Sequence, residues 1–496
     1  MSRTTTGALP DTFARALGAL RGGSSELAIP VGNEVGNAVG NDGNSAASTA
    51  AVAIAYSGGL DSSVLLHLAQ AWASARHIPL FAFHVHHGLS PNADAWLEHC
   101  RARCAALGVQ FDARHVTLQK NRSGVEAAAR KLRYAALGAL CEAHGIKLML
   151  TAHHLDDQAE TVLLQLLRGS GMAGLSGMDG ANSAPELLAN ATLVMARPLL
   201  PVSRAALEGY AAEHGLTWID DESNTDPRYA RNALRLQVMP ALAAAFPGFQ
   251  ERFARSAAHA QSAQRLLAEM AAQDVAAVEV DGTIDVVPLR AMSLDRVRNL
   301  LRHWFTVKHV RMPSTAWLDE MVTQLLEARP GAQMLVTHPD CHIRRHRDRL
   351  YIVDKLDELA GMRDPDDEGV IVRHAERFRW QGEAALDFAD YGGTLHFDLA
   401  PRGFAPAWLR EQGLHIDFRV GGERVKLAHN RPTRSLKYHY QALDVPAWER
   451  TRLPVVSAGK SVLYAAGIGM DYHHLVDGEG SIALRWEATA LAPSSP

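Results

Sequence analysis

The sequence predicts an α/β protein. A parallel sheet with helices on both faces is followed by a mostly helical middle domain and then by a small α+β C-terminal domain. Between residues 51 and 240, short apolar runs alternate with helical patterns, which is typical of a parallel sheet covered by helices. Near Pro240 the alternation stops and an Ala/Gln/Arg-rich helical stretch begins. Beyond residue 386, short strand patterns accompany a single helix.

Size and composition limit the class of protein. The 496 residues correspond to roughly three domains at about 150 residues each. With 47% apolar and 21% charged residues, the chain is not mainly disordered, collagen-like or a coiled coil. No run approaches the roughly 18 apolar residues of a membrane helix, and no signal peptide is recognisable. Four cysteines make no disulfide framework, so we expect a reduced, cytoplasmic protein without a membrane partner.

Residues 1–50 form a predicted N-terminal extension. A helix is expected over residues 11–20, and Gly, Asn, Ser and Ala dominate the sequence that follows. Such a stretch buries too little apolar surface to offset its ordering entropy, so we predict a flexible insert.

The next predicted domain, residues 51–240, begins with an apolar strand over 51–56 that ends in Ser-Gly-Gly. Further strands are expected at residues 80–85, 111–116 and 147–152, and helices at 93–107, 125–144 and 156–167. In open sheets of this kind, ligands bind beyond the carboxyl ends of the strands.

The middle domain is predicted to span residues 241–357. Its expected elements are helices at 241–274, 293–308 and 315–327 and a short hairpin within 333–351. A charged and polar linker, 358–385, then precedes the C-terminal domain, 386–496.

The turn after the first strand carries the strongest motif, Ser-Gly-Gly-Leu-Asp-Ser. Its glycines let the backbone approach a ligand, and the free N–H groups at the start of the next helix favour an anion. Asp61 beside an anion is repulsive unless a cation bridges them, which suggests Mg²⁺ on a polyphosphate. The lysine of a Walker A loop is missing, so γ-phosphoryl transfer is not the natural inference. The predicted nucleotide-binding residues are Ser57, Gly58, Gly59, Leu60, Asp61 and Ser62.

Three histidines lie at the end of the second strand: His84, His86 and His87. A metal site needs further ligands, and no acidic or cysteine partner is near in the sequence. We therefore favour a polar rim on the nucleotide pocket.

Acidic residues and histidines cluster where the fourth strand meets its helix: His153, His154, Asp156, Asp157 and Glu160. Asp157 and Glu160 are three residues apart and share a helical face. Helix capping explains carboxylates at a helix N-terminus, and it could be the whole role of Asp156. The alternative is that the cluster binds a cation or transfers a proton.

Two helices each carry a pair of arginines on one face. Arg130 and Arg133 are suited to neutralising charge that develops on a phosphate. The alternative is a surface ion pair of Arg130 with Glu126, four residues earlier, and a solvated Arg133. Arg231 and Arg235 are i,i+4 neighbours that could contact RNA phosphate or a nucleotide, or lie on a solvated face.

A basic segment, residues 419–437, stands out in a chain whose net charge is −4. Local patches bind phosphates through counterion release whatever the total charge, although a solvated basic face is the alternative. Among its six basic residues, the predicted RNA contacts are Arg431, Arg434 and Lys437.

Together these motifs resemble the PP-loop family of ATP pyrophosphatases and, within it, the tRNA(Ile)-lysidine synthetases. The resemblance rests on SGGLDS, HVHHGLS, EAAARKLRY, HHLDDQAET, RGSGMAGL and DESNTDPRYARN, in that order between residues 51 and 242. The stretch PTRSLKYHYQALDVPAWERTRLPVV, residues 432–456, resembles the family's tRNA-binding C-terminal domain. The middle of the chain matches only in general character.

The resemblance implies a carbon–nitrogen ligase that uses ATP with Mg²⁺, and a fold of the adenine nucleotide α-hydrolase type. ATP adenylates O2 of the wobble cytidine of tRNA(Ile) with a CAU anticodon and releases pyrophosphate. Free L-lysine then displaces AMP and forms lysidine, which switches decoding from AUG to AUA. We hypothesise that Asp61 holds metal and phosphate and that Asp157 recognises or deprotonates lysine. The remaining predicted catalytic residues are Arg130, Arg133, His153 and Glu160. Oligomeric state stays open, with a homodimer as one option.

Three other interpretations are weaker. A PP-loop tRNA thiolase of the 2-thiocytidine type needs reactive thiolates, whereas Cys100, Cys104 and Cys141 fall within predicted helices. A glutamine-fed amidotransferase commonly has a cysteine at the processed N-terminus, where this chain has Ser2 after Met1. An inactive RNA-binding protein on the same fold would not need intact SGGLDS and HHLDDQAET motifs.

Overall fold

The computed structural model describes residues 8–20, 51–86, 88, 90–117, 125–220, 228, 230–327, 329, 334–355 and 375–489. The insert predicted within 21–50 and most of the predicted linker lie outside these residues. The chain forms two compact units, residues 1–269 and 270–496, which are described separately.

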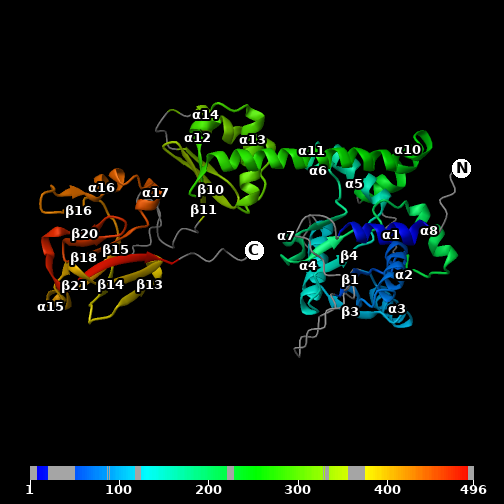
Figure 1. Ribbon diagram of the computed structural model, residues 1–496, viewed down its shortest axis with the longest axis horizontal. Coiled ribbons are helices and arrows are strands. Elements are labelled where there is room, and N and C mark those ends of the chain that lie inside the picture. Colours follow the sequence, from blue (N-terminus) through cyan, green and yellow to red (C-terminus); the bar gives the residue numbers. More distant parts are fainter. Residues whose placement is uncertain are drawn as a thin grey trace, which may run out of the picture. The chain divides into compact units, whose positions relative to one another are not determined.

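The first unit is built on a six-stranded sheet with the strand order β3-β2-β1-β4-β6-β5 (Figure 1). The predicted parallel arrangement is confirmed from β3 to β6, and β5 pairs antiparallel with β6 at the edge. The strands are β1 (Val52–Ala55), β2 (Leu80–His86), β3 (Gln110–His115), β4 (Leu148–Leu150), β5 (Ala181–Ser183) and β6 (Val194–Ala196).

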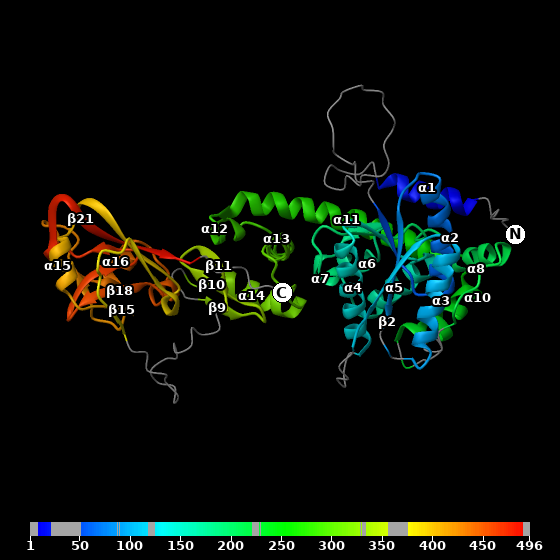
Figure 2. The ribbon, with the colours of Figure 1, turned by 90° about the horizontal axis from the view of Figure 1, so that it is seen from below.

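Helices cover both faces of this sheet. Successive side chains of a strand point to opposite faces, so the apolar strands present apolar side chains on both sides. Val52 and Ile54 of β1 pack in one buried cluster with α2, α3 and α8, whereas Ala53 packs in another with α4. Figure 2 shows α4 and α2 on opposite sides of the sheet. The helices are α1 (Ala8–Ala19), α2 (Leu60–Ser74), α3 (Ala93–Ala106), α4 (Val125–Ala143), α5 (Leu155–Leu167), α6 (Met172–Leu175), α7 (Pro185–Leu188) and α8 (Arg204–Glu213).

Two segments outside the predicted 51–240 boundary pack against this unit. Phe13 and Leu17 of α1 are buried in the same cluster as α2, so this helix is part of the core rather than of a separate extension. After α9 (Ala230–Ala233), a π-helical turn η2 (Leu234–Val238) and α10 (Met239–Ala245), the long helix α11 (Phe249–Val278) begins. Phe249 is buried against Ala159 of α5.

The second unit begins with a small domain in which the predicted helices are accompanied by a five-stranded sheet. The order β7-β8-β11-β10-β9 is antiparallel throughout. The predicted hairpin is β9 and β10, and β11 continues it as a third strand. The elements are β7 (Glu279–Val280), β8 (Thr283–Asp285), α12 (Val286–Leu289), α13 (Leu294–Val307), α14 (Thr315–Glu327), β9 (Met334–Thr337), β10 (Cys341–His346) and β11 (Arg349–Asp354).

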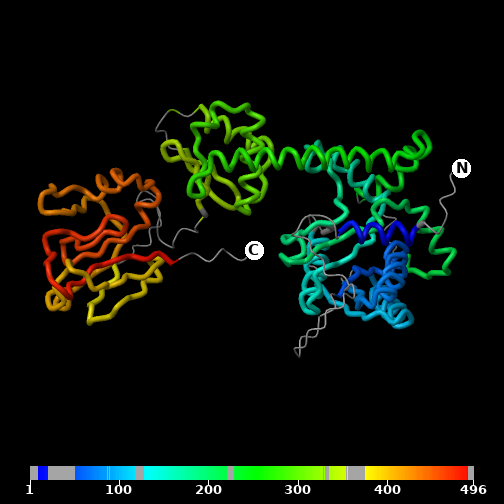
Figure 3. The backbone as a smooth tube through the Cα atoms, in the orientation of Figure 1, coloured from blue at the N-terminus to red at the C-terminus, as the bar shows by residue number. Residues whose placement is uncertain are grey.

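The C-terminal domain starts earlier than the predicted residue 386. Strand β12 pairs with β15, and Trp380 is buried with its ring stacked on Phe397, so this part of the predicted linker is folded. The order of the larger sheet is β12-β15-β18-β19-β20, a second sheet is β13-β14-β21, and β16-β17 form a hairpin. Figure 3 traces the chain through these strands. The elements are β12 (Glu376–Phe378), β13 (Ala385–Phe388), β14 (Gly393–Phe404), α15 (Pro406–Glu411), β15 (Leu414–Phe418), β16 (Arg424–Val425), β17 (Arg434–Ser435), α16 (Leu436–Ala442), α17 (Ala447–Arg450), β18 (Pro454–Ala458), β19 (Ser461–Ala465), β20 (Gly469–Met470) and β21 (Leu475–Ala488).

Among the described residues, no helix has the length and apolar character needed to span a membrane.

Candidate active site

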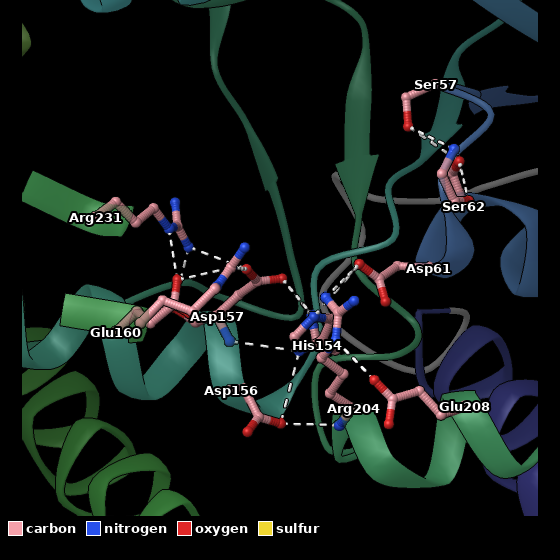
Figure 4. Close-up of polar contacts among 12 residues, drawn as sticks. Ser57, Asp61, Ser62, His154, Asp156, Asp157, Glu160, Arg204, Glu208 and Arg231 are labelled. Carbon is pink, nitrogen blue, oxygen red and sulfur yellow. Dashed lines mark hydrogen bonds and ion pairs between the residues drawn. The ribbon is translucent and has the colours of Figure 1, made fainter. Parts of the chain in front are cut away.

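The Ser-Gly-Gly-Leu-Asp-Ser turn lies between the end of β1 and the start of α2. Gly58 has φ +86°, and a Cβ there would lie 2.7 Å from Ile219 Cδ1 and 2.9 Å from Cys100 Sγ. The Ser57 and Ser62 hydroxyls lie 3.1 Å apart (Figure 4), and Ser62 donates to the Gly59 carbonyl. The sequence motif therefore forms a tight turn that only glycine permits at residue 58.

The start of α2 is suited to binding an anion. Its N-cap residue, Gly59, has no side chain that could accept hydrogen bonds from the first N–H groups of the helix. The N-terminal N–H groups and the helix dipole both attract negative charge. A phosphate group is the anion that such a strand-turn-helix arrangement accommodates well.

This turn forms one wall of a cleft of about 370 Å³. The cleft gathers side chains from the carboxyl ends of β1, β2 and β4 and from helices α4 and α8, as expected for a parallel sheet. The polar residues that line it include Ser57, Asp61, Ser62, His84, His86, Arg133, Thr151, His153, Arg204, Asp220 and Arg235. Two larger clefts, one beside α1 and one in the C-terminal domain, contain none of the predicted catalytic residues.

Asp61 faces this cleft near two basic groups. Its Oδ2 lies 3.6 Å from His154 Nε2 and 3.5 Å from the guanidinium of Arg204 (Figure 4). Its Oδ1 is buried, and no described residue forms a hydrogen bond with it. A buried carboxylate oxygen without a protein donor, next to a phosphate site, fits the oxygen ligand that Mg²⁺ prefers.

His154 connects Asp61 to the acidic helix α5. It is the N-cap of α5: its Nδ1 accepts from the backbone N–H of Asp157, whose carboxylate accepts from the His154 N–H. Burial alone would lower the pKa of His154, but the carboxylates of Asp61, Asp157 and Asp156 outweigh it and raise the pKa. This histidine therefore holds two carboxylates close together, which is a structural role that the sequence pattern did not reveal.

Asp157 and Glu160 are neutralised by the two arginines of the next helical segment. Arg231 Nε lies 2.7 Å from Glu160 Oε2 and its Nη2 lies 3.2 Å from Asp157 Oδ1 (Figure 4). Arg235 Nε lies 2.7 Å from Glu160 Oε1, and its Nη2 reaches Asp157 at 3.3 Å. The π-helical turn η2 contains Arg235, and such turns occur frequently at functional sites.

These contacts determine the charge state of Asp157. Burial alone would raise the pKa of Asp157, but His154 and Arg231 outweigh it and lower the pKa. The carboxylate is therefore ionised at neutral pH. It stabilises the folded state above its usual pKa, and this contribution is lost as the pH falls through the lowered value.

The arginine pairs should couple strongly in stability. Arg231→Ala or Arg235→Ala alone should cost about 1 kcal/mol, because the other arginine still pairs with the buried Glu160. Changing both leaves Glu160 unpaired and should cost about 4 kcal/mol, more than the sum of the two. Denaturant unfolding measures the loss, with Arg101→Ala, from an exposed pair with Glu98, as a control expected below about 1 kcal/mol. Strictly additive losses would contradict this arrangement.

His153 differs from its neighbour. Its Nδ1 lies 2.9 Å from the Thr151 hydroxyl, and burial lowers the pKa of His153 to about 3. The ring is therefore uncharged at neutral pH and offers a nitrogen lone pair in the cleft.

Some of the other predicted residues line the cleft and others do not. Arg133 lines the cleft, whereas Arg130 does not, and both guanidiniums lie over the Tyr134 ring at 5.5 and 4.8 Å. His84, which is buried, and His86 both line the cleft, and His86 lies 3.1 Å from Asp94, while His87 is outside the described residues.

Arg204 is a residue of the site that the sequence motifs did not reveal. Its backbone N–H donates to Asp156 at 2.8 Å, its side chain pairs with Glu208, and its guanidinium reaches Asp61. A positive charge in the first turn of a helix opposes the helix dipole, and this unfavourable position is the signal that could have identified it.

The cysteines are unsuited to sulfur chemistry. All four are buried, and burial raises the pKa of Cys100, Cys104 and Cys141 to about 12. Since the thiolate is the reactive form, these side chains are inert at neutral pH. The interpretation of the cysteines as structural is confirmed by their burial.

The predicted RNA contacts Arg431, Arg434 and Lys437 lie in the second unit. All three are exposed, and none forms an ion pair with any residue in the described part of the chain. They are thus available to an anionic partner, in contrast to Arg231 and Arg235.

A parallel sheet whose first strand leads into a glycine-containing anion-binding turn, with a partly buried carboxylate beside it, defines a PP-loop enzyme that uses ATP. The PP-loop domain model matches residues 32–242. The models for the TilS substrate binding domain and the TilS substrate C-terminal domain match residues 284–351 and 414–486.

Relatives extend this match over most of the chain. The tRNA(Ile)-lysidine synthase of Ralstonia nicotianae is 42% identical over 86% of this chain and 91% of that protein. Those of Burkholderia pseudomallei and Salmonella schwarzengrund are 42% and 35% identical, over 85% and 89% of this chain and 89% and 97% of theirs. The chain belongs to the tRNA(Ile)-lysidine synthase family. Among solved structures, the U34-tRNA thiolase NcsA from Methanococcus maripaludis matches with a TM-score of 0.38 and 16% identity, over 50% of this chain and 77% of that chain.

Proposed function

We propose that this enzyme joins free L-lysine to the wobble cytidine of tRNA(Ile) with a CAU anticodon, with ATP converted to AMP and pyrophosphate. It is thus a ligase that forms a carbon–nitrogen bond. The observation that carries the proposal is the position of the Asp157–Glu160 cluster, which His154 links to the phosphate-binding turn. Asp157 therefore lies beside the site for a triphosphate, and a cationic amine would compete with Arg231 and Arg235 for its carboxylate.

In the first step, cytosine O2 attacks the α-phosphorus of ATP and pyrophosphate leaves. The N–H groups of α2 and the hydroxyls of Ser57 and Ser62 are placed to donate to phosphate oxygens. Arg133 and Arg204 line the same cleft and can stabilise the departing charge. One such donor contributes roughly 3 kcal/mol to lowering the barrier.

Asp61 is the residue that would hold Mg²⁺ with ATP, through the buried Oδ1. The cation supplies neutralising charge on the phosphate oxygens when it is bound. Arg204 and His154 hold the other carboxylate oxygen and orient it.

In the second step, the ε-amine of lysine attacks C2 of the adenylated base and AMP leaves. Asp157, which is ionised, attracts the ammonium group of lysine, although it must then share its charge with Arg231. The amine has to lose a proton to react, since its usual pKa is about 10.4. This first proton leaves to solvent before attack. Forming the C–N bond makes the nitrogen much more acidic, and the uncharged His153 can accept the second proton, which this nitrogen then gives up. All these residues come from one chain, so the proposal does not depend on oligomeric state.

The thiolase alternative is disfavoured by the same structure. Sulfur transfer needs an accessible thiolate or cluster ligands, and every cysteine of this chain is buried. Lysine needs no such group.

The test is the nucleotide product and its dependence on substrates. Purified full-length protein is incubated with labelled ATP and Mg²⁺, with or without unmodified tRNA(Ile) transcript and labelled L-lysine. We expect AMP and lysine-labelled tRNA only when both are present. ADP with orthophosphate, or an unchanged rate and no labelled tRNA when lysine is added, would refute the proposal.

A further inference from the structure

The C-terminal domain presents an aromatic ring within its basic surface. Tyr438 is 52% exposed on α16, and the guanidinium of Arg434 lies over the ring, 5.3 Å from its centroid. Exposed single aromatics are ordinary, but this ring is flanked by cations that lack carboxylate partners among the described residues. The arrangement combines a flat ring with uncompensated positive charge.

The backbone under Tyr438 is firmly held. The Ser435 hydroxyl accepts from the Tyr438 N–H at 3.3 Å and caps α16. Leu436 and Tyr440 are fully buried on the inner side of the helix, and the Tyr440 hydroxyl donates to the Ala466 carbonyl at 2.8 Å. Little ordering entropy is therefore lost when a ligand contacts the outer side.

The hairpin before α16 holds Arg434. Strands β16 and β17 pair Val425 with Arg434, and the side chain of Arg424 donates to the Thr433 carbonyl at 3.0 Å. Arg434 therefore has a fixed backbone position beside Tyr438, and Lys437 is adjacent on the helix. Neither Arg434 nor Lys437 forms an ion pair with an acidic residue in the described ranges.

We propose that Tyr438 and Arg434 form a platform on which an unpaired nucleotide of the tRNA stacks, while Lys437 contacts a neighbouring phosphate. This inference rests on the proposed function, since it assumes that tRNA is the partner of this surface. Every base has a π-face, so a tyrosine with a stacked arginine accepts a base without reading its sequence. A base within a regular helix keeps both faces covered by its neighbours, so the platform selects a single-stranded element.

The test separates stacking from charge. Tyr438→Leu keeps an apolar side chain and a good helix former but removes the flat ring, whereas Tyr438→Phe keeps the ring. We expect Tyr438→Leu to raise the Kd for unmodified tRNA(Ile) transcript roughly tenfold, with the same dependence of log Kd on log salt, and Tyr438→Phe to bind like the parent. Lys437→Ala should instead reduce the salt slope by about one unit.

A short single-stranded RNA and a perfect RNA duplex provide the second measurement with the full chain. Tyr438→Leu should lose affinity for the single strand and keep its affinity for the duplex. If Tyr438→Leu matches the parent on tRNA and on the single strand, the platform is refuted. That result leaves the proposed function intact, provided that the parent still releases AMP in the presence of tRNA and lysine. If the parent itself released no AMP in the presence of tRNA and lysine, the proposed function would be refuted instead.

Discussion

Asp157→Asn should reduce lysine incorporation into tRNA by at least roughly a hundredfold, the size of effect expected when one charged group in a catalytic site is lost. The carboxylate is ionised at neutral pH because His154 and Arg231 lower its pKa, and its charge is what attracts the lysine ammonium group. Asparagine keeps the size of the side chain but not its charge. Pyrophosphate release in the presence of tRNA should continue, because the phosphate-binding turn and Asp61 are unchanged. Both steps are measured in the same reaction, as labelled pyrophosphate and as labelled lysine in tRNA.

The matched control is the same substitution one residue earlier. Asp156 accepts from the Arg204 backbone N–H at 2.8 Å and from the Gln250 side chain at 3.1 Å, and an asparagine oxygen can accept from the backbone N–H equally well. Asp156→Asn should therefore keep both steps. Thermal unfolding of both variants verifies that they are folded. Equal loss of pyrophosphate release and lysine incorporation in Asp157→Asn would refute the division of labour between Asp61 and Asp157.

Gly58→Ala should abolish ATP binding and destabilise the first unit. A non-glycine residue at φ +86° costs about 1–2 kcal/mol, and a Cβ 2.7 Å from Ile219 and 2.9 Å from Cys100 adds about 1–3 kcal/mol of overpacking. The turn has to move to relieve the contact, which removes the alignment of the α2 N–H groups with a phosphate. We expect pyrophosphate release to fall below one hundredth and the free energy of unfolding to fall by about 3 kcal/mol.

Two other glycines separate the effect of the backbone conformation from the effect of the close contacts. Gly108 has φ +65° and open space where a Cβ would lie, so Gly108→Ala should show only the smaller, conformational loss of stability and keep full activity. Gly59 has φ −73°, and a Cβ there meets nothing closer than 3.6 Å, so Gly59→Ala should leave stability almost unchanged. If Gly58→Ala were as stable as Gly59→Ala, the conclusion that the turn packs closely on Ile219 and Cys100 would be refuted.

Local sequence patterns were sufficient to predict many of the helices and strands of the first unit. The strand at 80–85 and the helices at 93–107 and 156–167 were predicted to within about two residues, because apolar periodicity and turn residues are read over a few neighbouring positions. The anion-binding turn was equally local, since Ser57, the glycines and Ser62 are contiguous. Predictions failed where packing partners are distant. Helix α1 joins the core through Phe13 and Leu17, and β12 pairs with β15, which follows the β13–β14 hairpin in the chain.

By itself, the sequence determined the α/β class, the phosphate-binding turn and the charged groups available near it. Only the tertiary structure decided how those charges pair. Arg231 and Arg235 were equally consistent with an RNA contact or a solvated face, and the fold places them against Glu160, which lies 71 and 75 residues earlier. The physical reason is that helical spacing specifies which side chains share a face, while the opposite charge that such a face meets depends on elements brought together across the sheet.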